Sequence, residues 1–375
     1  MTFPSSPEKR VVVVGGGIFG VSSATHLARW GAEVTLVTEG VLADGASGRS
    51  LSWLNSSRRR SGAYHQLRMA GIDRYRTLSA RNPGADWLKF DGGLTWDADD
   101  ETNEIETVFR HERSIGYDAQ LLAPAEVASV TPGVNVAAIA RQGAIFNAGE
   151  GWVDLPSLIR HLMAEFMRCG GRVLDNTGRA TVVVKAGRAR GIITGRGDRL
   201  EADSVLLAVG AATSSVLAQT GIRIPDATPI SLLVKTRPLR LALRAVLNTP
   251  RVAVRPTPDG ALALDSAWSE EEVILNSDGS YEVKASTVEG LLKEASAVLE
   301  GRPDLELESY GVGPKPIPAD GEPVIGQLDQ IGDYHVAFSH SGATLGLIIG
   351  ELLAGEIAAG ERHPMLEPFR PGRFS

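Results

Sequence analysis

The hydrophobic positions near the N-terminus change their spacing abruptly. Residues 11–14 are a continuous apolar run without polar alternation, which is typical of a strand buried on both faces of a parallel sheet. Over residues 18–30 the apolar positions recur with helical spacing, and Gly31 predicts the end of that helix. Residues 34–37 then form a second apolar run. The pattern predicts a strand, a helix and a second, parallel strand.

Later stretches extend this alternation of strand and helix patterns. Helical spacing predicts helices at residues 64–78, 101–115, 155–166, 289–299 and 347–359. Strand patterns predict a hairpin over residues 87–97 that turns on Gly92 and Gly93, a three-stranded meander within 172–204, and a parallel strand at 203–210. Residues 225–265 predict a mainly antiparallel sheet, and residues 334–338 a strand that a loop joins to the last helix.

Three glycines follow the first strand directly. Gly15, Gly17 and Gly20 have the G-x-G-x-x-G spacing, which permits a tight turn, the approach of a pyrophosphate and close packing of helix on strand. Because strand, glycines, helix and second strand follow in order, the stretch predicts a dinucleotide-binding site. The acid that accepts ribose hydroxyls ends the second strand in such sites. Here that place falls on Thr38, so we expect Glu39 to take the role, with Thr38 as the alternative.

These elements predict an α/β chain with a Rossmann-like domain and a second domain built on a mixed, mainly antiparallel sheet. A length of 375 residues favours two domains. We expect a discontinuous cofactor-binding domain made of residues 1–85, 145–225 and 315–375. Residues 86–144 and 226–314 would then form the substrate-binding domain.

Composition narrows the classes of partner. The net charge of −7 disfavours a nucleic-acid partner held by bulk electrostatics. The single cysteine, Cys169, excludes an internal disulfide and a cysteine-based metal cluster, and we expect it to pack at a helix end rather than to act as a nucleophile. We predict no metal site. The N-terminus lacks the apolar core of a secretion signal, and no apolar run approaches the ~18 residues of a membrane span, so we expect a cytoplasmic protein.

A small, polar loop follows the second strand. Ser47, Gly48, Arg49 and Ser50 lie in it, and in a doubly wound sheet such a loop is at the carboxyl edge, where ligands bind. Its amides and hydroxyls suit a phosphate or a ribityl chain. The following arginine run, residues 58–60, has two interpretations. It forms a solvated turn, or it brings guanidinium groups to a substrate carboxylate.

At this point the chain resembles the FAD-dependent D-amino-acid-oxidase-like superfamily, which includes glycine oxidase, sarcosine oxidase and D-amino-acid dehydrogenase. The motifs V-V-V-V-G-G-G-I-F-G, G-A-S-G-R-S-L-S-W-L-N-S, A-D-S-V-L-L-A-V-G-A, P-I-P-A-D-G-E-P-V-I-G and H-S-G-A-T-L-G carry the resemblance, which covers nearly the whole chain. The last two are the most specific. The resemblance implies a flavoprotein fold of the glutathione-reductase-2 type.

The resemblance also implies how FAD is held. No cysteine or histidine stands where some relatives tether the flavin, so we expect non-covalent FAD. Gly15, Gly17 and Gly20, with Ile18 and Phe19 between them, would take the pyrophosphate, and Glu39 or Thr38 the ribose. The phosphates and the ribityl chain would be lined by Ser47, Gly48, Arg49 and Ser50. Ala180 or Val182 would meet the adenine, Ala208 to Gly210 the ribityl side, and Gly342, Ala343, Thr344 and Leu345 the flavin pyrimidine.

Three residues are implied at the substrate. Many relatives have an arginine before the P-I-P-A-D-G run, where this chain has Lys315. Lysine attracts a carboxylate but lacks the bidentate fork, so we expect Lys315 to contact substrate or flavin and Arg59, with its neighbours in the run, to share the carboxylate. The alternative for Lys315 is a solvated loop. His340 is either a catalytic base or a loop histidine bonded to backbone beside the flavin.

The predicted reaction is FAD-dependent oxidation of the C–N bond of a small carboxylated amine, such as an N-substituted glycine, to an imine that water hydrolyses. Dioxygen or another acceptor would take the electrons, with hydrogen peroxide as the product in the first case. The alternatives are a D-amino-acid dehydrogenase, an NADPH-dependent flavin monooxygenase, an electron-transfer subunit and, disfavoured by the acidic balance, a nucleic-acid-modifying flavoprotein. The oligomeric state stays open.

Overall fold

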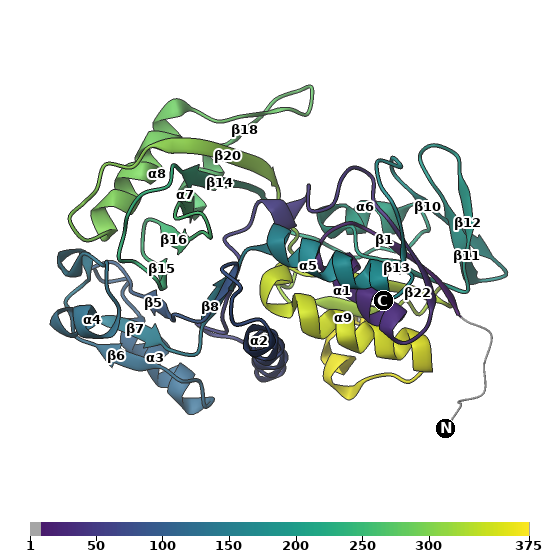
Figure 1. The fold of residues 1–375 in the computed structure, drawn as a ribbon, viewed down its shortest axis with the longest axis horizontal. Coiled ribbons are helices and arrows are strands. Elements are labelled where there is room, and N and C mark those ends of the chain that lie inside the picture. The colour runs from purple at the N-terminus through teal and green to yellow at the C-terminus, as the bar shows by residue number, and fades with distance from the viewer. Residues whose placement is uncertain (1–8, 375) are drawn as a thin grey trace. The chain divides into compact units, whose positions relative to one another are not determined.

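The computed structural model describes residues 9–374, which divide into two compact units (Figure 1). Within the described residues, unit 1 comprises residues 9–48, Leu155–Pro229 and residues 314–374, and unit 2 comprises Arg49–Asp154 and Ile230–Gly313. The predicted domain bounds differ from this division. Residues 49–85 and 145–154, expected in the cofactor-binding domain, belong to unit 2.

Unit 1 is built on a six-stranded sheet with the order β21-β22-β13-β1-β2-β9. All neighbouring strands are parallel except β21, which pairs antiparallel with β22 at one edge. The central strand β1 is buried beyond its first residue, as its unbroken apolar run requires. The bounds are β1 Arg10–Val14, β2 Glu33–Val37, β9 Arg172–Leu174, β13 Ser204–Leu207, β21 Val324–Gln327 and β22 Tyr334–Phe338.

Helices and a small sheet cover this six-stranded sheet. Helix α1 (Ile18–Arg29) packs against α5 (Leu155–Arg168) and α9 (Gly342–Ala359). The strands β10 (Thr181–Lys185), β11 (Arg188–Ile193) and β12 (Arg199–Glu201) form a separate antiparallel sheet whose apolar side chains share a buried cluster with Val12 and Val14. A short helix, α6 (Thr213–Ala218), follows β13.

Helix α9 corrects one expectation. It begins at Gly342, five residues before the predicted start, so the expected loop is partly its first turn. By length and composition alone its 18 residues could cross a membrane, but 67% of that stretch is buried inside the protein. Because α9 packs along α1, its apolar surface is that of a core helix.

The contact between α1 and α9 depends on a glycine. A Cβ added at Gly350 would lie 2.1 Å from Ser22 Oγ, whereas a Cβ at Gly355 on the same helix would meet nothing within 4 Å. We therefore expect Gly350→Ala to lower the free energy of unfolding by about 1–3 kcal/mol through overpacking. Gly355→Ala should raise it by roughly 0.5–1 kcal/mol, because alanine favours the helix. Urea unfolding of both variants checks this, and equal effects would contradict it.

Unit 2 is built on an eight-stranded sheet with the order β20-β14-β17-β16-β15-β5-β7-β6. Most neighbours are antiparallel, but β15 and β5 are parallel. The sheet therefore confirms the expected mixed, mainly antiparallel architecture. The bounds are β5 Gly93–Thr95, β6 Gln120–Leu122, β7 Ala144–Asn147, β14 Ile230–Thr236, β15 Val246–Asn248, β16 Ala253–Pro256, β17 Leu262–Asp265 and β20 Leu307–Pro314.

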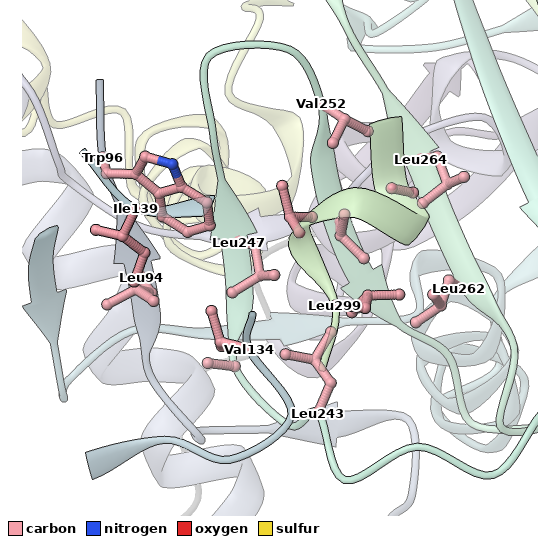
Figure 2. Packing of buried hydrophobic residues seen from close by; sticks show 14 of the residues in the cluster. Leu94, Trp96, Val134, Ile139, Leu243, Leu247, Val252, Leu262, Leu264 and Leu299 are labelled. Carbon is pink, nitrogen blue, oxygen red and sulfur yellow. The ribbon is translucent and has the colours of Figure 1, made fainter. Parts of the chain in front are cut away.

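Side-chain alternation gives this sheet one apolar face and an opposite, mixed face that carries the polar side chains, which we call the polar face. Leu94, Leu247, Val254 and Leu264 are neighbours across four strands, and all are buried in one hydrophobic cluster. Figure 2 labels Leu94, Leu247 and Leu264 in that cluster. Helix α8 (Ala285–Val298) adds Val288, Leu291, Ala295 and Val298 to that cluster. Because successive side chains of a strand alternate, the residues beside these four, which include Gly93 and Arg255, lie on the opposite face.

The remaining elements of unit 2 are short strands and helices. The strands β3, β8 and β4 form a three-stranded sheet, and β18 and β19 form a two-stranded one. The bounds are β3 Trp53–Leu54, β4 Leu88–Lys89, β8 Gly151–Val153, β18 Ile274–Leu275, β19 Tyr281–Glu282, α2 Gly62–Arg81, α3 Ile105–Ser114, α4 Pro124–Val130 and α7 Ala267–Glu271.

Three further sequence predictions are wrong. The strands at residues 87–97 form no hairpin, because β4 pairs with β8 while β5 pairs with β7 and β15. Gly92, with φ +86°, turns the chain from one sheet to the other. The first strand of the expected meander, β9, instead joins the parallel sheet beside β2. Cys169 does not pack at its helix end, because its side chain is exposed.

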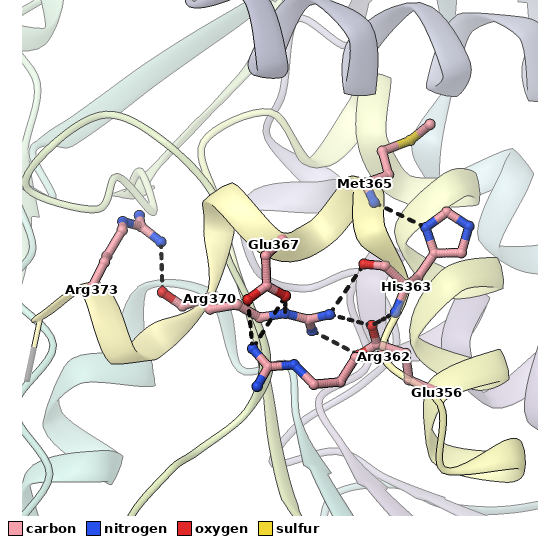
Figure 3. Close-up of polar contacts among 7 residues, drawn as sticks. All are labelled: Glu356, Arg362, His363, Met365, Glu367, Arg370 and Arg373. Atoms are coloured by element: carbon pink, nitrogen blue, oxygen red, sulfur yellow. Dashed lines mark hydrogen bonds and ion pairs between the residues drawn. The ribbon is translucent and has the colours of Figure 1, made fainter.

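A buried ion pair fixes the C-terminal segment of unit 1 (Figure 3). Arg370 lies between two short 3-10 helices, Pro364–Phe369 and Pro371–Phe374, and donates two hydrogen bonds to the carboxylate of Glu356 in α9, at 2.5 and 2.8 Å. Both side chains are less than 10% exposed. Glu356 also accepts from the backbone of His363, whose carbonyl accepts from Arg370. The pair thus links the last helix to the end of the chain.

Candidate functional site

The glycine loop joins β1 to α1 in unit 1. Gly15 has φ +124°, and a Cβ there would lie 2.2 Å from the carbonyl oxygen of Ala208. A Cβ at Gly20 would lie 1.9 Å from the carbonyl oxygen of Gly15. These two glycines are required by the turn and by close packing, as the motif predicts.

Gly17 has a different reason to be glycine. Its backbone is extended, with φ −82° and ψ −179°, which any residue can adopt. A Cβ there would meet a single neighbour within 4 Å, Ser47 Oγ at 3.2 Å. A small shift of that hydroxyl would admit a side chain at Gly17, so no backbone contact requires the glycine, and its place before the first turn of α1 suits an approaching pyrophosphate. The donor set suits that anion, because the amides at a helix N-terminus carry partial positive charge.

The loop after β2 closes on the start of this helix. Ser47, in the short 3-10 helix Ala46–Gly48, accepts a hydrogen bond from the backbone N–H of Ile18 at 3.0 Å. Phe19, the next residue of α1, is buried. A Cβ at Gly48 would lie 2.2 Å from the carbonyl oxygen of Ala43, so the loop is tightly folded.

The two candidates for the ribose differ in exposure. Thr38 is buried, its side chain lies beside Gly16, and its carbonyl accepts from Thr177 Oγ1 at 3.0 Å. Glu39, two residues after the end of β2, is exposed, with a carboxylate oxygen 3.7 Å from Arg179 Nε. The arrangement favours Glu39 over Thr38 as the group that a ribose would meet.

Most other predicted cofactor residues also lie in unit 1. Ala208 follows β13 and its N–H donates to the carbonyl of Val14 at 2.8 Å, while Gly210 begins a 3-10 helix. Ala180 and Val182 are buried on the small antiparallel sheet or just before it. The first turn of α9 comprises Gly342, Ala343, Thr344 and Leu345, so the positive end of that helix dipole lies there.

Arg49 and Ser50 fall in unit 2 instead. The side chain of Arg49 lies against Gly311 and Gly313, where a Cβ would come within 2.4–2.8 Å of it. Ser50 Oγ accepts from the N–H of Ser52 at 3.0 Å. The predicted phosphate loop is therefore divided between the units after Gly48.

The three predicted catalytic residues are also divided. Lys315 and His340 belong to unit 1, where Lys315 is half-buried and His340 is exposed between β22 and α9. Arg59 belongs to unit 2, is exposed, and pairs with Glu104 at 3.3 Å. The neighbouring Arg58 pairs with Asp97 at 2.6 Å. The catalytic roles of these residues remain predictions.

Unit 2 contains a buried polar cluster that the sequence did not reveal. At its centre is Glu150, whose carboxylate accepts hydrogen bonds from the hydroxyl of Tyr117 and from Trp53 Nε1. Burial raises the pKa of Glu150 to about 8, although both hydrogen bonds oppose the rise. A Cβ at Gly93 would lie 2.1 Å from this carboxylate, so the cluster rests on the polar face of the large sheet. Near neutral pH, Glu150 can hold or release a proton.

A second acid and a histidine extend the cluster. Glu112 accepts from Asn147 Nδ2 at 3.1 Å and from the backbone of Arg58 at 2.7 Å, and burial raises its pKa. His65 and Ser56 share a hydrogen bond of 2.8 Å, and burial, with Arg68 nearby, lowers the pKa of His65. These side chains come from separate segments without regular spacing, so no motif signals them. Within residues 9–374, no group of three or more histidine, cysteine or acidic side chains is arranged to hold a metal ion.

Comparison with known proteins shows the family to which this chain belongs. The family model described as "FAD dependent oxidoreductase" matches residues 10–356. The glycine oxidase of Pseudomonas aeruginosa is 28% identical, with 96% of this chain and 97% of the relative covered. Solved structures are similar in fold: glycine oxidase from Bacillus cereus has a TM-score of 0.81 at 19% identity, covering 96% of this chain and 98% of that one. Iminodiacetate oxidase from Chelativorans sp. BNC1 has a TM-score of 0.79 at 21% identity, covering 96% and 99%. The chain therefore belongs to the DAO family of FAD-dependent oxidoreductases, flavoenzymes that act on amines or amino acids, and its cofactor is FAD.

Proposed function

We propose that this enzyme oxidises the C–N bond of a small carboxylated amine, in particular a secondary amine such as an N-substituted glycine. The amine becomes an imine, and water hydrolyses the imine to an aldehyde or keto acid and a smaller amine. Dioxygen is the proposed acceptor and is reduced to hydrogen peroxide. The balance is one amine, one dioxygen and one water converted to one carbonyl compound, one amine and one peroxide.

Gly17 is the observation that carries the cofactor half of this proposal. Neither its backbone angles nor any backbone contact requires glycine, its one close neighbour is the Ser47 hydroxyl, and it lies at the positive end of α1. The substrate half draws support from relatives named glycine oxidase and iminodiacetate oxidase. The compounds in these two names, glycine and iminodiacetate, each carry a carboxylate beside an amine.

FAD, when bound, supplies the two-electron acceptor for the C–N bond. The chain supplies binding and charge. In our proposal unit 1 holds FAD non-covalently, with Gly15, Gly17 and the first turn of α1 at the pyrophosphate and Glu39 at the ribose. The positive end of α9 favours negative charge near Gly342. Lys315 is the proposed cationic contact of this unit, and His340 a neighbour of the flavin. We place the enzyme in the cytoplasm.

Anaerobic reduction of the bound flavin tests the proposal. We expect sarcosine or iminodiacetate to remove the flavin absorbance, and dimethylamine, which matches sarcosine without its carboxylate, to leave it unchanged. Re-admitted air should then restore the absorbance and release peroxide. Reduction by D-alanine alone would overturn the choice of a secondary amine. Reduction by NADPH, but by none of the amines, would replace the whole proposal with a monooxygenase.

The same experiment decides between oxidase and dehydrogenase. Solved structures of similar fold include an L-proline dehydrogenase from P.horikoshii, with a TM-score of 0.82 at 20% identity. A flavin that sarcosine reduces, but that only an artificial electron acceptor re-oxidises quickly, would identify a dehydrogenase. Fast re-oxidation by air supports the proposed oxidase.

A further inference from the structure

A buried arginine on the polar face of the large sheet has no acidic partner. Arg255 in β16 is 4% exposed. Its Nη1 donates to the carbonyl of Pro256 at 3.2 Å, and its buried Nε has no hydrogen-bond partner. Among residues 9–374, no carboxylate lies within ion-pair distance, 4.0 Å, of its guanidinium. A buried arginine without an ion pair is unusual, because desolvation of the charge is costly.

The charge is nevertheless retained at neutral pH. Burial lowers the pKa of Arg255 to about 10, and the more distant carboxylates of Asp154, Asp259 and Asp265 partly offset the shift. The group therefore remains a cation near pH 7. Departures of this kind from the rules for core residues are expected at functional or strained sites.

A second unsatisfied donor lies beside Arg255. Its guanidinium lies over the ring of Trp152, with Cζ 5.3 Å from the ring centroid. The indole Nε1 of Trp152 is buried and also has no hydrogen-bond partner. The indole can only donate, and the guanidinium can only donate, so these two complete their bonding with an acceptor.

We propose that Arg255 and Trp152 form a carboxylate-binding subsite in unit 2, which takes a carboxylate of the amine substrate. The planar fork of a guanidinium matches the two oxygens of a carboxylate, and the indole N–H adds a donor to the same ligand. The aromatic ring holds the guanidinium plane in position. The inference rests on the proposed function for the identity of its ligand, but the subsite itself is made of side chains within one unit.

The subsite makes substrate selection depend on negative charge. An amine without a carboxylate would leave the guanidinium buried and unpaired, so the arginine would discriminate against it. A carboxylated amine supplies the anionic partner that the guanidinium of Arg255 does not find within the protein. The Glu150 cluster lies on the same face of the sheet, over Gly93, but its carboxylate is already held by Tyr117 and Trp53.

Binding of propionate, with propionamide as its uncharged match, tests the subsite without turnover. In the wild-type holoenzyme we expect propionate, but not propionamide, to raise the melting temperature and to give a measurable Kd. Arg255→Met should weaken propionate about 10–100-fold, and Arg255→Lys less, because lysine keeps the charge but loses the fork. The control is Arg237→Met, which removes an exposed arginine that pairs with Glu306 at 3.2 Å and should leave the Kd unchanged.

Thermal stability separates a binding role from a structural one. Arg255→Met removes an unpaired buried charge, so its melting temperature should equal or exceed that of the wild type. A large fall in melting temperature together with unchanged propionate binding would overturn the proposal. If Arg255→Met does not fold, the comparison of propionate with propionamide in the wild type still tests the proposal. Equal effects of the two compounds would contradict a carboxylate site.

Flavin reduction distinguishes failure of the subsite from failure of the proposed function. With sarcosine as substrate, we expect Arg255→Met to raise KM far more than it lowers kcat. If sarcosine reduces the flavin equally well in wild type and Arg255→Met, the subsite is wrong and the proposed function stands. If no amine reduces the flavin but propionate binding still depends on Arg255, the proposed function is wrong and the subsite stands as an anion site.

Discussion

Replacing Arg370 with methionine is expected to lower the free energy of unfolding by about 3–5 kcal/mol. The reason is the carboxylate of Glu356, which is buried on α9 and would lose two charged hydrogen bonds at once. A buried charge without a partner is far more costly than an absent pair. Urea unfolding, followed by circular dichroism on the holoenzyme, measures the loss.

A neighbouring arginine provides the matched control. Arg362 pairs with Glu367 at 3.1 Å, and both side chains are more than 60% exposed. Arg362→Met should therefore cost only about 0–1 kcal/mol. The double variant Arg370→Met with Glu356→Leu should recover much of the stability that the single change removes, because the unpaired charge is gone. Equal losses in Arg370→Met and Arg362→Met would refute the argument.

Stability should also fall as the pH rises from about 6.5 to 8, and Glu150 should be the cause. Its folded pKa, about 8, lies above the ordinary value of 4.5, so the fold favours the protonated acid. The contribution is complete below the unfolded pKa and is lost as the pH rises through the folded one. At about 1.4 kcal/mol for each pH unit, this window should cost roughly 2 kcal/mol. Chemical unfolding at several pH values measures the slope.

Glu150→Gln is the informative variant, because glutamine resembles the protonated acid and does not titrate. It should remove this slope and be more stable than the wild type at pH 8. The two proteins must be compared at equal pH, because a second group also makes stability depend on pH. Burial lowers the pKa of His335 to about 4, so the fold loses stability as the pH falls below the ordinary histidine value of 6.5. The exposed Glu361, changed to glutamine, serves as the control and should keep the wild-type slope. A slope retained in Glu150→Gln would exclude Glu150 as its source.

Elements whose signal lies within a short window could be predicted from the sequence. The run at residues 11–14 and the helical spacing after it correspond to β1 and α1, and the strand at 203–210 corresponds to β13 beside β1. The choice of strand partners could not be read in this way. Gly92 and Gly93 have the composition of a hairpin turn, yet the strands beside them join different sheets. Partner choice depends on contacts with Phe146 and β15, far away in the chain.

In the candidate site, too, residues with a local sequence signal could be predicted and residues brought together by the fold could not. The glycine loop was readable because each glycine has a fixed place in a short motif. The cluster around Glu150 was not, because Trp53, Tyr117 and Glu150 are brought together only by the fold of unit 2. Arg255 gave no signal either. Its place on a strand between apolar residues becomes informative only when the structure shows that it is buried without an acidic partner.

The strand order of unit 1 has a consequence for synthesis on the ribosome. β1 and β2 emerge first, but β13 begins 167 residues after the end of β2, at Ser204 against Val37, and β22 is made only near the end of translation. At about 5–20 residues per second, the nascent chain exposes these apolar strands with unpaired edges for on the order of tens of seconds. Unit 1 cannot close before the last segment is made, so the newly made protein depends on protection from aggregation until its C-terminal strands arrive.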